Sequence, residues 1–162
     1  MAQAEIAAGL SSTCSDAGAF RLAEDVLSKG TPDLFIVEAA VNDDQDGHFL
    51  ERRCIRGMEG CVRQVLLKNP ACAVVIGLMV NRGQYLSLKN GVMPLQYRAH
   101  ARVAAHYNAA IANVGSALAA ETAKDGMTWE RYGDCHPSPE GCDLGAKVMM
   151  EAIGKVFDPA KS

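Results

Sequence analysis

Two short apolar runs separated by one long helical pattern constrain the fold of this chain more than any other feature. "ACAVVIGLMV" (residues 71–80) is a continuous apolar run, and "PDLFIVEAA" (residues 32–40) is apolar except for Asp33 and Glu38; both patterns are typical of buried strands. Between them, residues 48–68 repeat apolar side chains at helical spacing, and "KNP" ends that pattern. Alternation of strand and helix predicts a parallel sheet wrapped by helices.

The rest of the chain continues this alternation. A weak strand pattern at residues 4–10 precedes a polar turn and a helical pattern that has Asp16 as a possible cap and Gly30 as a stop. Polar loops are expected at residues 41–48 and 81–94. Further elements are predicted as helices at residues 95–108, 116–124 and 140–157 and as a short strand near residues 109–114. The sequence shows no internal repeat, so we expect one α/β domain over residues 1–162.

Composition argues against several classes of protein. The chain is 49% hydrophobic and 22% charged, which suits one compact domain with a core. The net charge of −3 provides no basic stripe, so nucleic acid is not an expected partner. The longest apolar run is about half of the roughly 20 residues that a membrane span needs. No charged segment followed by an apolar one opens the chain, so no signal peptide is expected.

The six cysteines are irregularly spaced, which favours free and mostly buried thiols over a disulfide framework, although fifteen pairings remain open if all are paired. Cys135, His136 and Cys142 are conceivable metal ligands, but no Cys-x-x-Cys pair accompanies them. We therefore expect no metal and no cofactor.

Asn42 follows the stronger of the two apolar runs directly, in "AVNDDQDG". A side-chain amide at a strand end can donate a hydrogen bond to a developing oxyanion. The alternative is that Asn42 and its acidic neighbours only cap the turn and the next helix. Asp43, Asp44 and Asp46 also suggest calcium, but the glycine and distal glutamate of an EF-hand are missing from their register.

His136 lies in "GDCHPSPEGCD", a segment rich in turn-forming residues. The following proline keeps its backbone out of the helical region, so its ring can project from a loop as a general base. Asp134 can accept from one ring nitrogen and leave the other free. A purely structural Asp-x-His remains the alternative. The other histidines, which are His48, His100 and His106, are interpreted as ordinary surface or packing residues.

Four segments taken in order resemble one known family. They are "SDAGAFRLAEDVL", "PDLFIVEAAVND", "MEGCVRQVLLKNP" and "DCHPSPEGCDLGA", and they are similar to segments of the SGNH, or GDSL-type, hydrolases from about residue 6 to residue 157. The resemblance implies a flavodoxin-like, three-layer α/β/α sandwich. It also implies hydrolysis of small acyl esters by a serine nucleophile, with O-acetylated sugars or glycans as the narrower expectation.

The resemblance also implies roles for individual residues. "AVND" matches the family's Gly-x-Asn-Asp block and makes Asn42 the expected oxyanion-hole side chain. "DCHP" matches the terminal Asp-x-x-His-Pro block, so His136 is the expected base and Asp134 its orienting acid. The turn "GLSSTCS" falls where the family has an oxyanion-hole glycine, and Ser12 is the aligned residue, able to supply its N–H if its backbone angles allow.

The chain departs from the family pattern in three places. One residue instead of two separates Asp134 from His136, and Ala40 replaces the glycine of the second block. No Gly-Asp-Ser block is present, and Ser11, Ser12 and Ser15 lie in the oxyanion turn, so no nucleophile is assigned. We expect a chain that lacks the family's first strand through truncation at its amino end and has little or no activity by itself.

Two further expectations follow from a missing strand. The chain is either the remainder of an esterase or a noncatalytic relic that binds a glycan, an ester or a protein partner. A rearranged sheet is one way to satisfy the backbone groups that the missing strand would pair. A homodimer through exposed sheet edges is another.

Overall fold

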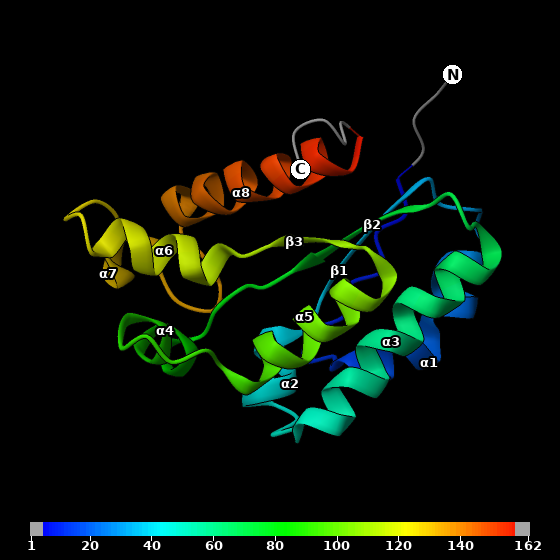
Figure 1. Cartoon of the computed structure of the whole chain (residues 1–162), viewed down its shortest axis with the longest axis horizontal. Coiled ribbons are helices and arrows are strands. Elements are labelled where there is room, and N and C mark those ends of the chain that lie inside the picture. Colours follow the sequence, from blue (N-terminus) through cyan, green and yellow to red (C-terminus); the bar gives the residue numbers. More distant parts are fainter. Residues whose placement is uncertain (1–4, 158–162) are drawn as a thin grey trace.

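A three-stranded parallel sheet forms the centre of the structure, a computed structural model that describes residues 5–157. Its strands are β1 (Leu34–Glu38), β2 (Ala73–Gly77) and β3 (Ala110–Ala112), and β2 lies between the other two (Figure 1). Ile36 pairs with Val75, and Ile76 pairs with Ile111. The two apolar runs of the sequence are therefore neighbouring strands, and the predicted α/β class with a parallel sheet is confirmed.

Helices cover both faces of this sheet (Figure 1). α3 (Glu51–Lys68) and α5 (Leu95–Tyr107) cover one face, where they enclose Val74 and Ile76. α8 (Pro139–Phe157) covers the other face, where Ala152 packs on Val75. Consecutive β2 side chains point to opposite faces and all are buried, which explains why this strand is apolar at every position.

The remaining helices surround the ends of the strands. α1 continues directly into a π-helical turn, η1, and packs against α3; Leu22 and Val26 of these two elements also pack with Phe35 of β1. The bounds are α1 (Ser15–Leu22), η1 (Ala23–Leu27), α2 (Ala40–Gln45), α4 (Arg82–Lys89), α6 (Val114–Thr122) and α7 (Trp129–Tyr132). The predicted long and carboxyl-terminal helices correspond to α3, α5, α6 and α8.

Three sequence predictions of local structure are wrong. Residues 5–10 form no strand (residue 4 lies outside the described residues), and three alanines or glycines in that run leave little side chain to pack. The expected loop at residues 81–94 contains α4, which begins with a capping box between Asn81 and Gln84. The expected loop at residues 41–48 contains most of α2, whose first N–H groups are accepted by Glu38.

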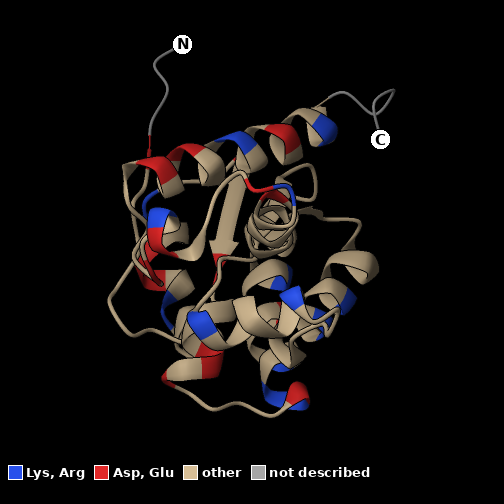
Figure 2. Cartoon of the chain, turned by 90° about the vertical axis from the view of Figure 1, so that its left-hand side faces the viewer, with Lys and Arg blue, Asp and Glu red and all other residues tan. Residues whose placement is uncertain are grey.

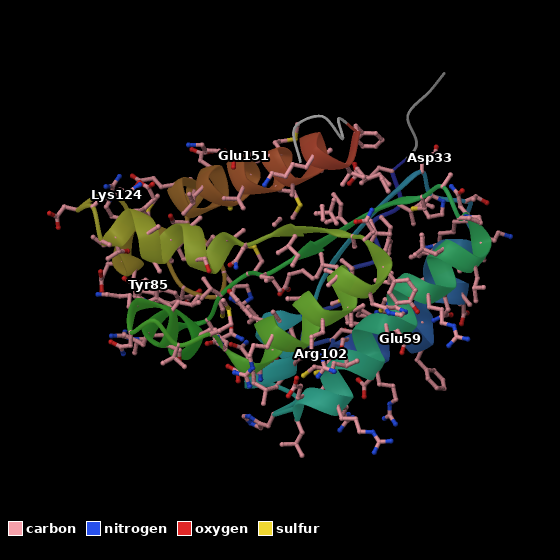
Figure 3. The ribbon with its side chains drawn as sticks, in the orientation of Figure 1. Asp33, Glu59, Tyr85, Arg102, Lys124 and Glu151 are labelled. Atoms are coloured by element: carbon pink, nitrogen blue, oxygen red, sulfur yellow. The ribbon has the colours of Figure 1, made fainter. Side chains whose placement is uncertain are left out.

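Charged residues are distributed over the outer surfaces of the helices, with acidic and basic positions interspersed (Figure 2). In the outer layer, Arg102 of α5 donates to Glu51 of α3, and Tyr107 donates to Glu59; Figure 3 labels Arg102 and Glu59. These bonds tie α3 to α5 above their shared apolar contact. Within residues 5–157, no helix combines the length and the apolar character that crossing a membrane requires.

β1 is an edge strand in the part of the chain that the structure describes, because it pairs with β2 alone. Its Ile36 points to the same face as Val75, the face that α8 covers, and is still 45% exposed. The backbone groups on the outer side of β1 are thus available to a further strand. Both the absent family strand and the homodimer remain predictions about this edge.

Candidate active site

A buried aspartate joins the turn before α1 to the start of α2. Asp43 Oδ1 accepts the N–H of Ser15 at 2.7 Å, and its Oδ2 accepts the Ser15 hydroxyl at 2.7 Å. His100 of α5 places Nε2 3.0 Å from the same Oδ2. Ser15, Asp43 and His100 are all buried, and together they fix the turn, α2 and α5 to one another.

Close backbone approach makes this cluster possible. A Cβ at Gly57 of α3 would lie 2.2 Å from the Ser15 hydroxyl and 2.6 Å from the Asp16 nitrogen, so only glycine allows α1 to begin there. His100 Nδ1 has no hydrogen-bond partner among the residues described.

The predicted oxyanion-hole residues lie beside this cluster. Asn42 is in the first turn of α2 and its Nδ2 donates to Asp46 at 2.8 Å, so it does not cap the helix, whose N-cap is Ala39. The thiol of Cys14 donates to the Asn42 carbonyl at 3.4 Å. Ser12, two residues earlier, is exposed and has φ 53°, the left-handed region that favours glycine. The turn with Ser12 and the first turn of α2, which contains Asn42, are therefore neighbours.

The acidic residues of α2 accept hydrogen bonds from separate donors. Asp44 accepts from Asn81 at 2.8 Å and from Gln96 at 3.1 Å, while Asp46 accepts from Asn42. In the described part of the chain, these carboxylates do not converge on one point as calcium ligands would. The bonds of Asp44 connect α2 to the segment after β2 and to the first turn of α5.

Glu38 ends β1 inside this region and was not identified from the sequence. Its Oε1 accepts the N–H groups of Ala40 and Val41, at 2.7 and 3.3 Å. Burial raises the pKa of the Glu38 carboxyl, and the two backbone hydrogen bonds oppose that shift without cancelling it. The signal that could have identified Glu38 is a charged residue at the end of an otherwise apolar run.

Burial also affects the pKa values of the cysteine thiols near the cluster. All six cysteines are free, as predicted, and three of them are buried. Burial raises the pKa of Cys54 to about 12, with the Asp43 charge as the next cause, and burial raises the pKa of Cys61 to about 12 as well. Both thiols therefore behave as apolar packing groups.

His136 and Asp134 lie in the loop between α7 and α8. Asp134 Oδ1 accepts the His136 N–H at 2.6 Å and lies 3.8 Å from His136 Nδ1. Gly133 begins the loop with φ 108°, and a Cβ there would lie 2.7 Å from the Ser138 nitrogen. The side chain of His136 is 91% exposed and that of Asp134 is 65% exposed. The pair is thus formed, and solvent reaches both members.

The structure joins some of the predicted site residues and leaves others apart. The turn with Ser12 adjoins the first turn of α2, which contains Asn42, at the carboxyl end of β1 (Figure 1). The loop with His136 follows Tyr132, which packs on Val80 and Val114 beyond the ends of β2 and β3. Among the described residues, no hydrogen bond links Asp134 or His136 to Ser12 or Asn42. All four residues belong to the carboxyl side of the sheet, where ligands bind in open α/β folds.

His100 was predicted to be an ordinary surface or packing residue, and it is a buried residue of the packing between α5 and α2. Its bond to Asp43 was not predicted from the sequence. The two residues are 57 positions apart, and only the packing of α5 on α2 brings them together.

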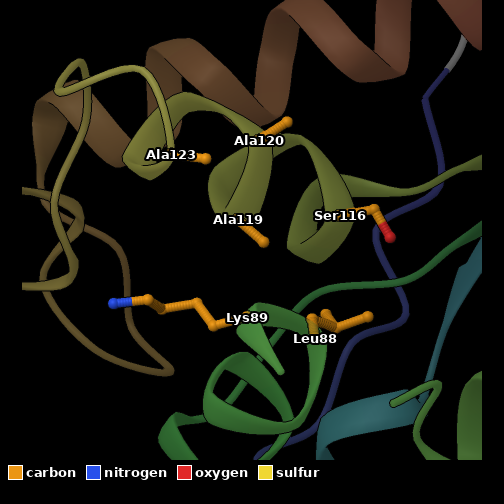
Figure 4. Close-up of a pocket in the computed structure, with 6 residues that line it drawn as sticks. All are labelled: Leu88, Lys89, Ser116, Ala119, Ala120 and Ala123. Carbon is orange, nitrogen blue, oxygen red and sulfur yellow. The ribbon is translucent and has the colours of Figure 1, made fainter. Parts of the chain in front are cut away.

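A shallow groove between α4 and α6 lies outside these clusters (Figure 4). Leu88 and Lys89 of α4 form one wall, and α6 forms the other with Ser116 and three alanines. None of the predicted site residues lines this groove. It includes part of the segment at residues 81–94, most of which is helix α4 and not the expected polar loop.

No protein-family model matches the chain, and no curated protein does. Among solved structures, the chain is similar to a two-domain esterase active on acetylated mannans. With mannopentaose bound, that esterase is 32% identical with a TM-score of 0.72, and a second structure of it is 33% identical with a TM-score of 0.71. Each alignment covers 93% of this chain but only 38% of the esterase chain, so this chain spans well under half of that esterase's length.

Two more distant structures support the fold alone. One is an alpha/beta hydrolase enzyme from the metagenome of Lake Arreo in Spain, at 15% identity and a TM-score of 0.69, covering 90% of this chain and 70% of that one. The other is a mutant acetyl-xylooligosaccharide esterase from Geobacillus, at 20% identity and a TM-score of 0.61, covering 89% and 69%. The neighbours are thus esterases and an alpha/beta hydrolase, which agrees with the SGNH-type resemblance.

Proposed function

We propose that the chain is part of an SGNH-type ester hydrolase that removes acetyl groups from carbohydrates. The observation that supports this most is the similarity, over 93% of the chain, to an esterase active on acetylated mannans. Independent support comes from the order of "AVND" and "DCHP" in the sequence. "AVND" directly follows β1, and "DCHP" lies in the loop between α7 and α8. Both segments lie on the carboxyl side of the sheet, the side where α/β folds bind substrates.

In the proposed mechanism, His136 accepts the proton of a serine hydroxyl as that oxygen attacks the acetyl carbonyl. Asp134 orients the imidazole, and the 3.8 Å separation from Nδ1 needs only a small rotation of the exposed side chains to become a hydrogen bond. The amide of Asn42 and the N–H of Ser12 would stabilise the tetrahedral oxyanion. His136 then returns the proton to the sugar hydroxyl that leaves, and water hydrolyses the acetyl-enzyme.

The nucleophile is the part of this mechanism for which the described residues offer no side chain. Ser15 is buried and donates to Asp43, so its hydroxyl is unavailable. Ser12 and Ser11 are exposed, but no histidine contacts them in the described structure. We propose that the serine belongs to a Gly-Asp-Ser turn outside these 162 residues, on a strand that pairs with the free edge of β1, and that the chain alone has little turnover.

A second candidate function is noncatalytic binding of a glycan, an ester or a protein partner. The observation that favours it is the exposed position of His136 together with the absence of a contact to Asn42 in the described residues. In this case the same surface would bind acetylated sugars without cleaving them.

One experiment separates the two candidates. The chain is assayed with nitrophenyl acetate and with acetylated mannan oligosaccharides, alone and extended at its amino end by a strand that has the Gly-Asp-Ser turn. The esterase proposal predicts turnover only in the extended form, and a loss of at least about 100-fold in its His136→Ala variant. His106→Ala is the matched control, because that ring is also exposed but lies on α5, and it should retain full turnover.

Each result decides between the candidates. Equal turnover in the extended chain and its His136→Ala variant would overturn the role of the histidine. Binding of the oligosaccharide without turnover in the extended form would support the noncatalytic function instead.

A further inference from the structure

Three consecutive side chains in the α7–α8 loop place different donor atoms close together. The atoms are an oxygen of Asp134, the sulfur of Cys135 and Nδ1 of His136, and all lie within 4.8 Å of one another. Within residues 5–157, this is the one group of three such residues that is close enough to hold a metal ion. The loop is the one that the proposed mechanism uses for its base.

Two of the three separations in this loop are close to those between ligands of a tetrahedral ion. Ligands at about 2.0 Å for nitrogen and about 2.3 Å for sulfur lie roughly 3.5 Å apart on neighbouring tetrahedral corners. Cys135 Sγ lies 3.5 Å from His136 Nδ1, and Asp134 Oδ1 lies 3.8 Å from the same nitrogen. The third separation, between an Asp134 carboxylate oxygen and Cys135 Sγ, is within 4.8 Å.

The donor set selects the class of ion. Calcium and magnesium prefer oxygen ligands, whereas an imidazole with a thiolate favours zinc and its relatives. The exposure of Asp134 and His136 leaves the fourth corner open to water. Cys142 is nearby in sequence but donates to the Pro137 carbonyl at 3.7 Å and does not belong to the group.

We propose that Asp134, Cys135 and His136 bind a zinc-class divalent cation, which withdraws His136 from its role as a base. The ion bonds to the sulfur and releases the thiol proton to solvent. Bonding at Nδ1 puts the ring proton on Nε2, so neither nitrogen can then accept a proton from a nucleophile. This inhibitory effect rests on the proposed esterase function, whereas the binding of the ion does not.

The test uses Co²⁺ as the probe on the 162-residue chain, without substrate. One equivalent should produce a sulfur-to-cobalt charge-transfer band, and Zn²⁺ should displace it. Cys135→Ser should abolish the band and weaken Zn²⁺ binding by at least about 10-fold, and His136→Gln should weaken it similarly. Cys142→Ser, the matched control in the same segment, should bind both ions as the unchanged chain does.

The two proposals fail separately in this design. A chain that binds no cobalt, or a Cys135→Ser variant that binds as tightly as the unchanged chain, would overturn the metal site whatever the esterase assay shows. Metal binding with the expected pattern, in a chain whose extended form has no turnover, would overturn the esterase function alone. Circular dichroism of both variants, whose substitutions lie in a loop, verifies that the comparison is made between folded proteins.

Discussion

Two aspartate–histidine pairs lie on the carboxyl side of the sheet, and burial makes them different in kind. In the Asp43–His100 pair, Nε2 lies 3.0 Å from the carboxylate and neither side chain is exposed. In the Asp134–His136 pair, the corresponding distance is 3.8 Å and both side chains are mostly exposed. The same two residue types thus hold segments together at one place and remain free to meet a substrate at the other.

The difference follows from what each pair contacts. Asp43 also accepts two hydrogen bonds from Ser15, so the buried pair connects three segments that are distant in sequence. The exposed pair belongs to one loop and contributes about 0–1 kcal/mol, as surface ion pairs usually do. Enclosure also prevents His100 from acting as a base toward any external ester. The buried pair therefore supplies rigidity beside Ser12 and Asn42, and the exposed pair supplies the chemistry that we propose.

The largest expected effect is a difference in the free energy of unfolding between alanine variants of Asp43 and Asp134. Asp43→Ala leaves two groups of Ser15 and one of His100 without a partner in a buried site, which should lower the free energy of unfolding by about 3–5 kcal/mol. Asp134→Ala, the matched control, should change it by no more than about 0.5 kcal/mol, because water replaces the lost contact. Urea denaturation followed by circular dichroism measures both.

Similar losses in the two variants would contradict this comparison. A small loss in Asp43→Ala would mean that the turn before α1 is held by its apolar contacts alone. A large loss in Asp134→Ala would mean that the α7–α8 loop is a structural element and not a free site.

A smaller effect is expected at Glu38, whose carboxyl lies near enough to the buried pair for Asp43 and His100 to affect its pKa. Burial raises the pKa of its carboxyl, so the charged form is less stable in the folded chain than in the unfolded one. Glu38→Gln keeps an oxygen that can accept from Ala40 and Val41, and it removes the buried charge. The variant should therefore be more stable than the unchanged chain at pH 7.

The pH dependence of this gain has a definite sign. The raised pKa means that the folded chain keeps the Glu38 proton to a higher pH than the unfolded chain. The gain in Glu38→Gln should be complete above the folded pKa, shrink as the pH falls, and vanish below about 4.3, the ordinary value for glutamate. Urea unfolding of both proteins from pH 4 to pH 8 tests it. A gain that grows toward low pH would contradict the burial of this carboxylate as the cause.

The sequence predicts the sheet and its covering helices well because those elements depend on local periodicity. Predominantly apolar runs give β1 and β2, and the helical repeat gives α3, which ends at Lys68 as "KNP" predicts. The buried cluster depends instead on long-range packing, since Asp43 and His100 are 57 positions apart and neither has a local signal. The predicted roles of Ser12, Asn42, Asp134 and His136 came from resemblance and remain proposals, although the positive φ of Ser12 suits a position that glycine holds in the family.

The smallest expected effect concerns Ser12. Its turn leads to Ser15, which is bonded to Asp43 of the buried pair. A serine at φ 53° is strained, so Ser12→Gly relieves that strain while it adds conformational freedom to the unfolded chain. The two effects should nearly cancel, leaving the free energy of unfolding within about 0.5 kcal/mol of the unchanged chain. Ser11→Gly is the matched control, because Ser11 has no positive φ and gains nothing from glycine; it should be destabilising by roughly 0.5–1 kcal/mol. If urea denaturation shows equal losses for the two glycine variants, the turn is not held in the left-handed conformation, and the buried pair does not shape the backbone at Ser12.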